Sequence, residues 1–198
     1  MGMAGIEHGI GEIVQGNTVP QSLVFPSWPH AGFFSMVAGE PAMSLVPNLL
    51  VSGIFTLIVA GVYIYWAFRQ PVAGYNTGVQ AILAIVMLMV GGGIFPPLLA
   101  FGLAFLAGKI NHPLSGGNNV SARPCRNFFC THWRLLYTLA LAAWLMLFPG
   151  LNLLGYFLGI ENEALTIAII LLALVSLPLV IFSAFVHDAA RQAALPAN

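Results

Sequence analysis

Long apolar stretches separated by short polar segments make up most of this chain. Residues 47–68, 79–108, 135–159 and 165–186 are apolar runs that contain no charged side chain. A helix needs about 20 apolar residues to cross the ~30 Å hydrocarbon core of a bilayer. Three of the runs, 47–68, 135–159 and 165–186, are therefore predicted to be full transmembrane helices. The pattern predicts an all-α polytopic integral membrane protein.

The run over residues 79–108 is interrupted by the sequence GGGIFPP at residues 91–97. Glycine commonly follows the end of a helix, and proline commonly occupies its first turn. This order predicts one helix that ends near Gly91 and another that begins near Pro96. A single helix of this length would extend about 45 Å, which exceeds the hydrocarbon core. We therefore expect a broken, re-entrant helical hairpin at 79–108; the alternative is four transmembrane helices with the second one kinked.

The basic residues favour the hairpin, because Lys and Arg gather on the cytoplasmic side of membrane proteins. A hairpin places all six basic residues on one side, whereas a crossing would leave Arg69 on the other side. The hairpin predicts a multi-pass protein with a cytoplasmic C-terminus. A prokaryotic cell membrane is the expected location.

The polar segments suggest the division of the chain into domains. Residues 1–44 are expected to form a non-cytoplasmic tail, in which the apolar segment 31–38 is either a short interfacial helix or irregular. Residues 45–187 are expected to form a single helical membrane domain, and residues 188–198 a C-terminal tail. Because the spans themselves carry no charge, and ion-coupled carriers usually hold ionisable groups at depth, the pattern argues against a proton- or Na⁺-coupled carrier.

Composition agrees with the membrane class. The chain is 59% hydrophobic and 6% charged, whereas soluble domains carry about 25% charged residues. The zero net charge gives no basis for binding nucleic acid. The expected partners are the lipid bilayer and either a second copy or another membrane protein. No cofactor is expected, because none of the five histidines lies in the middle of a span where haem ligands would be needed.

The polar loop at residues 109–134 and the end of the last span hold the residues with catalytic or metal-binding chemistry. In either topology these segments lie on the same side of the membrane. The sequence assigns neither a catalytic nor a metal site there, because polar residues flanking span ends explain the pattern and the Cys/His spacing is not that of a standard zinc site. The candidates are His112, His132, His187 and Asp188 for catalysis, and Cys125, Cys130 and His132 for metal binding.

Three functional hypotheses follow. The leading one is a non-enzymatic accessory, scaffold or assembly protein that acts through helix packing. The first alternative is a small passive channel or carrier for a neutral or anionic solute, because a half-helix beginning near Pro96 would direct its positive dipole end into the membrane. The second is a membrane enzyme with a cytoplasmic-face His/Cys site. The candidate residues of the helix break and pore are Gly91, Gly92, Gly93, Pro96 and Pro97.

Overall fold

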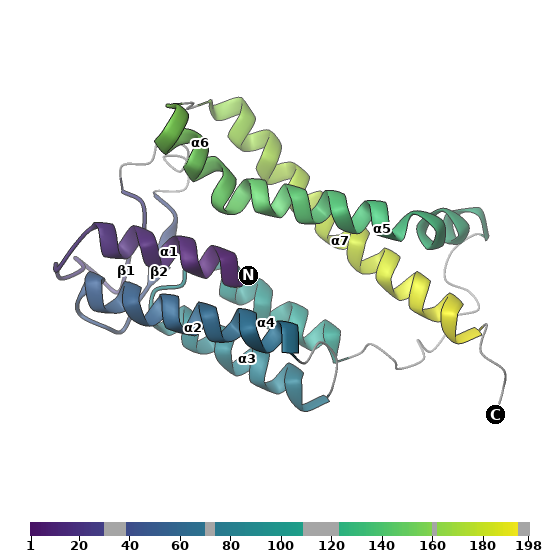
Figure 1. Ribbon diagram of the computed structural model, residues 1–198, viewed down its shortest axis with the longest axis horizontal. Helices are drawn as coiled ribbons and strands as arrows, with labels where there is room; N and C mark the ends of the chain where they lie inside the picture. The colour runs from purple at the N-terminus through teal and green to yellow at the C-terminus, as the bar shows by residue number, and fades with distance from the viewer. Residues whose placement is uncertain (30–38, 70–73, 109–122, 160–161, 194–198) are drawn as a thin grey trace. The chain divides into compact units, whose positions relative to one another are not determined.

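The computed structural model of the protein is almost entirely helical (Figure 1). Three helical segments are long and apolar enough to cross a membrane: Leu49–Arg69, Asn127–Gly150 and Glu163–Ala190. The prediction of an all-helical membrane protein with three such helices is confirmed. The structure describes residues 1–29, 39–69, 74–108, 123–159 and 162–193.

The chain divides into two compact units. Unit 1 comprises Met1–Gly108 and Phe148–Glu161, and unit 2 comprises Lys109–Leu147 and Asn162–Asn198. This division by packing does not test the expected separation of a tail at residues 1–44 from a membrane domain at residues 45–187, which stays a prediction.

Unit 1 contains a helix within the segment expected to be a tail. This helix, α1 (Gly2–Val14), lies alongside α2 (Leu49–Arg69) (Figure 1). The two helices are antiparallel, because Gly2 faces Ile64 near the end of α2 and Gly9 faces Gly53 near its beginning. The predicted interfacial segment 31–38 lies outside the described residues.

The helices α1 and α2 approach closely because glycines face one another. A Cβ atom added at Gly9 would lie 2.9 Å from the carbonyl oxygen of Gly53, and one added at Gly53 would lie 2.5 Å from the carbonyl oxygen of Gly9. Small residues allow this backbone-to-backbone packing, which is common between membrane helices. The fit leaves no room for a side chain at either position.

We expect the substitution Gly53→Ala to destabilise the protein by about 1–3 kcal/mol, because the backbone of α1 must shift to admit the methyl group. The matched control is Gly61→Ala on the same helix, where an added Cβ meets nothing within 4 Å. That control should stabilise the helix slightly, by about 0.5–1 kcal/mol. Thermal unfolding in detergent measures both effects, and equal effects of the two substitutions would contradict the close packing.

Two short strands follow α1. They are β1 (Val24–Pro26) and β2 (Pro41–Met43), which pair antiparallel with Phe25 opposite Ala42. Phe25 and Ala42 form a small apolar core with Leu49 at the start of α2. The hydropathy pattern did not indicate these strands, because each is only three residues long.

The helix break predicted at residues 91–97 is present. The helix α3 (Gly74–Met89) ends before the glycines, and α4 (Phe95–Ala107) begins just before the two prolines. The helices pack against each other, and Gly108 after α4 lies near Thr77 in α3. The segment is therefore an antiparallel helical hairpin and not one kinked helix.

Unit 2 consists of two long helices that pack against each other, α5 (Arg123–Leu145) and α7 (Glu163–Ala193). At their contact the ring of Phe129 meets that of Phe182 edge-on at 4.9 Å, and the Ser183 hydroxyl donates to the carbonyl oxygen of Phe129. Asn162 caps α7 through a bond from the Leu165 N–H to its side-chain oxygen.

The boundaries of these spans differ from the sequence expectation. Residues 123–134, expected to be part of a loop, form the beginning of α5, with Pro124 in the first turn where proline suits a helix. The span predicted at 135–159 instead ends in a π-helical turn, η2 (Met146–Gly150), and a separate helix, α6 (Leu151–Leu158), belongs to unit 1. The break falls where Phe148 has extended φ and ψ angles. In the predicted C-terminal tail, α7 continues to Ala193.

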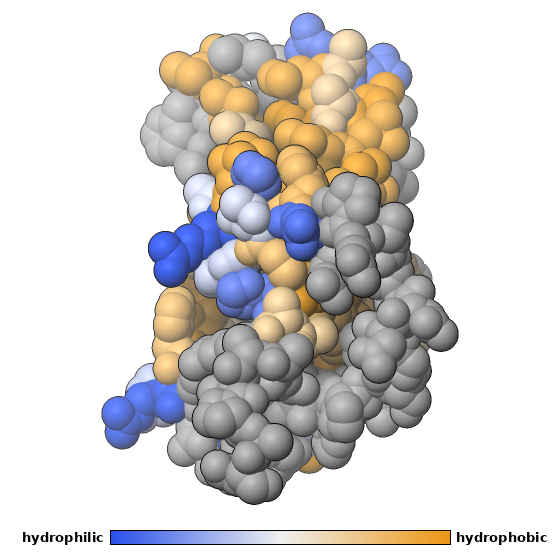
Figure 2. All heavy atoms as spheres, turned by 90° about the vertical axis from the view of Figure 1, so that its right-hand side faces the viewer, coloured by the Kyte–Doolittle hydropathy of each residue, from blue (hydrophilic) through white to orange (hydrophobic). Residues whose placement is uncertain are grey.

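The described surface is largely apolar, as expected of a protein that contacts lipid. On the face seen in Figure 2, orange hydrophobic side chains cover broad areas and blue hydrophilic ones gather in limited patches. Exposed apolar side chains on the outside of a helix cost little free energy in lipid, whereas in water they would favour aggregation.

Candidate functional site

The helix break keeps its backbone hydrogen bonds through neighbouring elements. The carbonyl oxygen of Val90, at the end of α3, accepts hydrogen bonds from the hydroxyls of Ser52 and Thr56 on α2, at 2.7 and 2.6 Å. At the start of α4, the Ile94 N–H donates to the carbonyl oxygen of Pro41 on β2. A break away from water is tolerated only when other groups satisfy its backbone in this way.

Gly91, Gly92 and Gly93, here called the glycine turn, have a second role. A Cβ atom added at Gly91 would lie 2.1 Å from Oε1 of Glu12, and one added at Gly93 would lie 2.4 Å from Nε2 of His8. Both glycines also have positive φ angles, +110° and +80°. Glycine is therefore required at both positions by the backbone and by the side chains of α1 that press against it.

The side chains that meet the glycine turn belong to a buried polar group, here called the Glu–His cluster. Its members are buried in unit 1; among the described residues neither carboxyl oxygen of Glu7 has a hydrogen-bond partner, and Glu12 has only the Ser52 hydroxyl beside it. Fully buried ionisable side chains without partners are rare in proteins. The cluster comprises Glu7, His8, Glu12 and Glu40, which are 3%, 2%, 0% and 6% exposed.

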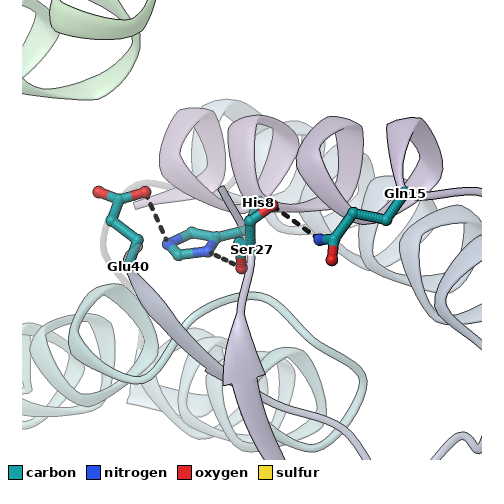
Figure 3. A network of polar contacts seen from close by, with 4 residues as sticks. All are labelled: His8, Gln15, Ser27 and Glu40. Carbon is teal, nitrogen blue, oxygen red and sulfur yellow. Dashed lines mark hydrogen bonds and ion pairs between the residues drawn. The ribbon is translucent and has the colours of Figure 1, made fainter. Parts of the chain in front are cut away.

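His8 is the centre of the contacts within the cluster (Figure 3). Its Nδ1 lies 2.8 Å from the hydroxyl oxygen of Ser27, and its Nε2 lies 3.7 Å from a carboxyl oxygen of Glu40. The amide of Gln15 donates to the carbonyl oxygen of Ser27 at 2.9 Å, which holds Ser27 beside α1. The imidazole therefore lies between a hydroxyl and a carboxyl group.

The backbone at Glu40 is held in an unfavourable conformation. Glu40 has φ +55°, the one non-glycine residue with positive φ in the described part of the chain. Two hydrogen bonds hold this segment against the end of β1, from the Ser27 N–H to the Glu40 carbonyl and from the Trp28 N–H to the Gly39 carbonyl. Strained residues of this kind concentrate at functional sites.

Burial shifts the protonation of the cluster. Desolvation raises the pKa of Glu12 to about 8, with a partly offsetting effect of the Ser52 hydroxyl, and raises the pKa of Glu40 to about 8. Desolvation and the nearby Glu40 raise the pKa of Glu7 further. Desolvation lowers the pKa of His8 to about 4. At neutral pH the carboxyls therefore hold protons and His8 is neutral, so the His8–Glu40 contact is not an ion pair under these conditions.

No basic side chain offsets the carboxyls. Within the described ranges, no lysine or arginine lies within ion-pair distance of Glu7, Glu12 or Glu40. The N-terminus of α4 is one source of positive potential, because its Ile94 cap directly follows the glycine that faces His8, and the buried α-amino group of Met1 at the start of α1 is another. A helix dipole is a weak substitute for a counter-ion, so the cluster can carry little negative charge while it is buried.

The cluster does not form a metal site. Among the described residues, no group of three or more His, Cys, Asp or Glu side chains is arranged to hold a metal ion.

The catalytic and metal candidates from the sequence that the structure describes lie in unit 2. His112 lies outside the described residues, and the side chain of Cys125 is not described. His132 stacks on Phe128 of its own helix at 4.6 Å. His187 lies against the Trp133 ring at 4.8 Å, with Asp188 next in the chain. Cys130 donates to the Val186 carbonyl. The contacts of His187 and Cys130 join the start of α5 to the end of α7, but the described side chains among the candidates form no group that could hold a metal ion.

Sequence reasoning missed the Glu–His cluster because residues 1–44 were assigned to a tail. Two signals were available. Glycines at positions 2, 5 and 9 form one face of a helix, as in closely packed membrane helices. His8 and Glu12 are four residues apart, so a helix places them on the same face.

Comparison with known proteins gives no relative: no family model, curated protein or solved structure matches the chain. Its function is therefore inferred from the arrangement of its side chains.

Proposed function

We propose that this chain is a multi-pass membrane protein that binds and releases protons at the Glu–His cluster, as the proton-binding part of a carrier or relay. The observation that carries the proposal is the burial of three carboxyls and one imidazole without a basic partner. Ionisable side chains buried in membrane proteins commonly mark proton or ion pathways. The spans predicted from the sequence carry no charge, and the ionisable groups that support proton coupling lie instead on α1 and at Glu40, packed beside them.

The position of the cluster favours access from one side of the membrane. Ser52 and Thr56 lie three and seven residues after the start of α2, about 5 and 10 Å along the helix axis. The ~30 Å core therefore leaves a short path to the side where α2 begins and a long path to the other side. In the topology favoured by the basic residues, the side of the membrane where α2 begins is non-cytoplasmic. The same topology makes the hairpin α3–α4 re-entrant and the C-terminus cytoplasmic.

This proposal is preferred to a passive channel through the helix break. Glu12 and His8 cover the glycine turn, and Pro96 and Pro97 are fully buried. An accessory role in a larger complex is compatible with proton binding, and the transport measurement described below distinguishes the two. The contacts of His132 and His187 give no support to a membrane enzyme.

We expect the purified protein to take up protons when the pH is lowered from 9 to 6, because the buried carboxyls titrate in this range. The substitution Glu12→Gln keeps the shape of the protonated side chain and should remove about one proton per chain. Potentiometric titration in detergent measures the uptake. The matched control is Glu163→Gln, which makes the same substitution at an exposed carboxyl at the start of α7.

Equal proton uptake by the wild type and the Glu12→Gln variant would contradict the proposal. Proteoliposomes with an enclosed pH indicator then test transport: a proton flux that Glu12→Gln abolishes indicates a carrier or relay. Proton uptake without flux would instead assign the protein to the proton-handling part of a complex.

A further inference from the structure

We propose that loss of protons from the Glu–His cluster releases α1 from the glycine turn, so that α1 is the moving element of the protein. This inference rests on the proposed proton binding. It assigns the mechanical response to one helix, with the remainder of unit 1 as its fixed support.

The first argument is the way in which α1 is held. Its contacts with α2 centre on glycines: Gly5 faces Ala60, and Gly9 faces the backbone of Gly53 and the side chain of Leu57. Side-chain hydrogen bonds tie α1 and its C-cap Gln15 to the carbonyl oxygens of Pro26 and Ser27 and to the Ser27 hydroxyl, and the Ser52 hydroxyl of α2 lies beside Glu12. The Ile13 side chain of α1 in turn lies against Gly53, so α1 is held on α2 by close apolar packing.

The second argument is that the backbone hydrogen bonds of the helix break do not depend on α1. The backbone groups of the helix break are bonded to α2 and to the β2 strand region: Val90 to Ser52 and Thr56, Ile94 to Pro41, and Met89 to the Leu45 N–H. None of these bonds involves α1. When α1 leaves, the hairpin therefore keeps its hydrogen bonds.

The third argument is the balance of charge around α1. Glu7, His8 and Glu12 project from α1 itself, and Glu40 faces them from the segment before β2. The facing residues of α2 are the uncharged Ser52 and Thr56, and its Arg69 lies 13 residues beyond the latter. The sequence of α4 contains no titratable residue, and that of α3 contains only Tyr75, in its first turn.

Deprotonation of the carboxyls would therefore place several negative charges in a buried site without a counter-ion. Burial of an unpaired ion costs several kcal/mol, and like charges add repulsion. Movement of α1 away from the glycine turn relieves both costs, because it brings Glu12 and Glu7 toward water. The proton-bound cluster keeps α1 docked, and the proton-free cluster favours its release.

Distance measurements between spin labels test the movement in the full chain in lipid nanodiscs. Labels at the exposed positions Val14 and Phe68 join the end of α1 to the far end of α2. Labels at Phe68 and the exposed Leu98 join α2 to α4 and form the matched control. Both pairs are introduced after replacement of the native cysteines by Cys125→Ser and Cys130→Ser.

Between pH 6 and pH 9 the Val14–Phe68 distance distribution should shift by about 5 Å or more, on the scale of one helical turn. The Phe68–Leu98 distribution should not change. In the triple variant Glu7→Gln, Glu12→Gln, Glu40→Gln, the pH-dependent shift of the first pair should disappear.

An unchanged Val14–Phe68 distance in a protein that takes up protons would overturn the movement of α1 and leave proton binding intact. A shift of both label pairs would also overturn it, because unit 1 would then loosen as a whole. Absence of proton uptake between pH 9 and 6 would instead refute the proposed function on which this inference depends.

Discussion

The substitution Gly91→Ala is expected to destabilise unit 1 more than any other glycine-to-alanine substitution at or near the glycine turn. The new Cβ would lie 2.1 Å from one carboxyl oxygen of Glu12 and 2.4 Å from the other, at a backbone φ of +110°. The positive φ costs about 1–2 kcal/mol and the overpacking about 1–3 kcal/mol. For a chain of this length the sum corresponds to a fall in thermal midpoint of about 10 °C.

The matched control is Gly16→Ala. Gly16 has φ +82°, but an added Cβ there meets nothing within 4 Å. This substitution measures the backbone cost alone, so the difference between the two variants is the cost of crowding Glu12. In the background Glu12→Ala, the effect of Gly91→Ala should fall to the level of Gly16→Ala. If Gly91→Ala remains as harmful in that background, Glu12 does not occupy the space beside the glycine turn.

The helix break shows which part of the fold the sequence could predict. Glycines followed by prolines specify a helix end and a helix start through local backbone preferences, so the break was predictable within a few residues. The contacts made by the glycines were not. They depend on Glu12 and His8, about 80 residues earlier, and no local preference connects two such segments.

The assignment of α1 to a tail has a related cause. A helix of 13 residues is too short to span a membrane, and its Glu7, His8 and Glu12 give it the polarity of an exposed segment. Hydropathy measures the preference of a side chain for water and not the presence of a partner surface. The glycine-to-glycine contact with Gly53 buries α1 despite its charges, and the raised carboxyl pKa values reduce the cost.

The largest expected effect of pH is a loss of stability as the solution becomes alkaline. The buried carboxyls have raised pKa values, so between pH 4.5 and 8 the folded protein holds more protons than the unfolded chain. Stability therefore falls as the pH rises through this window. His8, whose pKa is lowered from 6.5 to about 4, acts in the opposite direction between these two values and has no effect above pH 6.5. From pH 6.5 to 8 the carboxyls dominate the slope, opposed by the Met1 α-amino group, whose pKa burial lowers from 8.0, and the thermal midpoint should fall by about 5 °C.

Two variants separate the contributions of carboxyl and imidazole. Glu12→Gln cannot ionise, so it should reduce the slope above pH 6.5 and make the protein more stable than the wild type at pH 8.5. His8→Gln should leave the slope above pH 6.5 unchanged and alter it only at lower pH, because the imidazole titrates there in the unfolded chain. Thermal unfolding from pH 5 to pH 9 measures all three proteins. A wild-type midpoint that is constant from pH 6.5 to 8.5 would mean that the buried carboxyls are already ionised and paired, and proton binding by the Glu–His cluster would have to be abandoned.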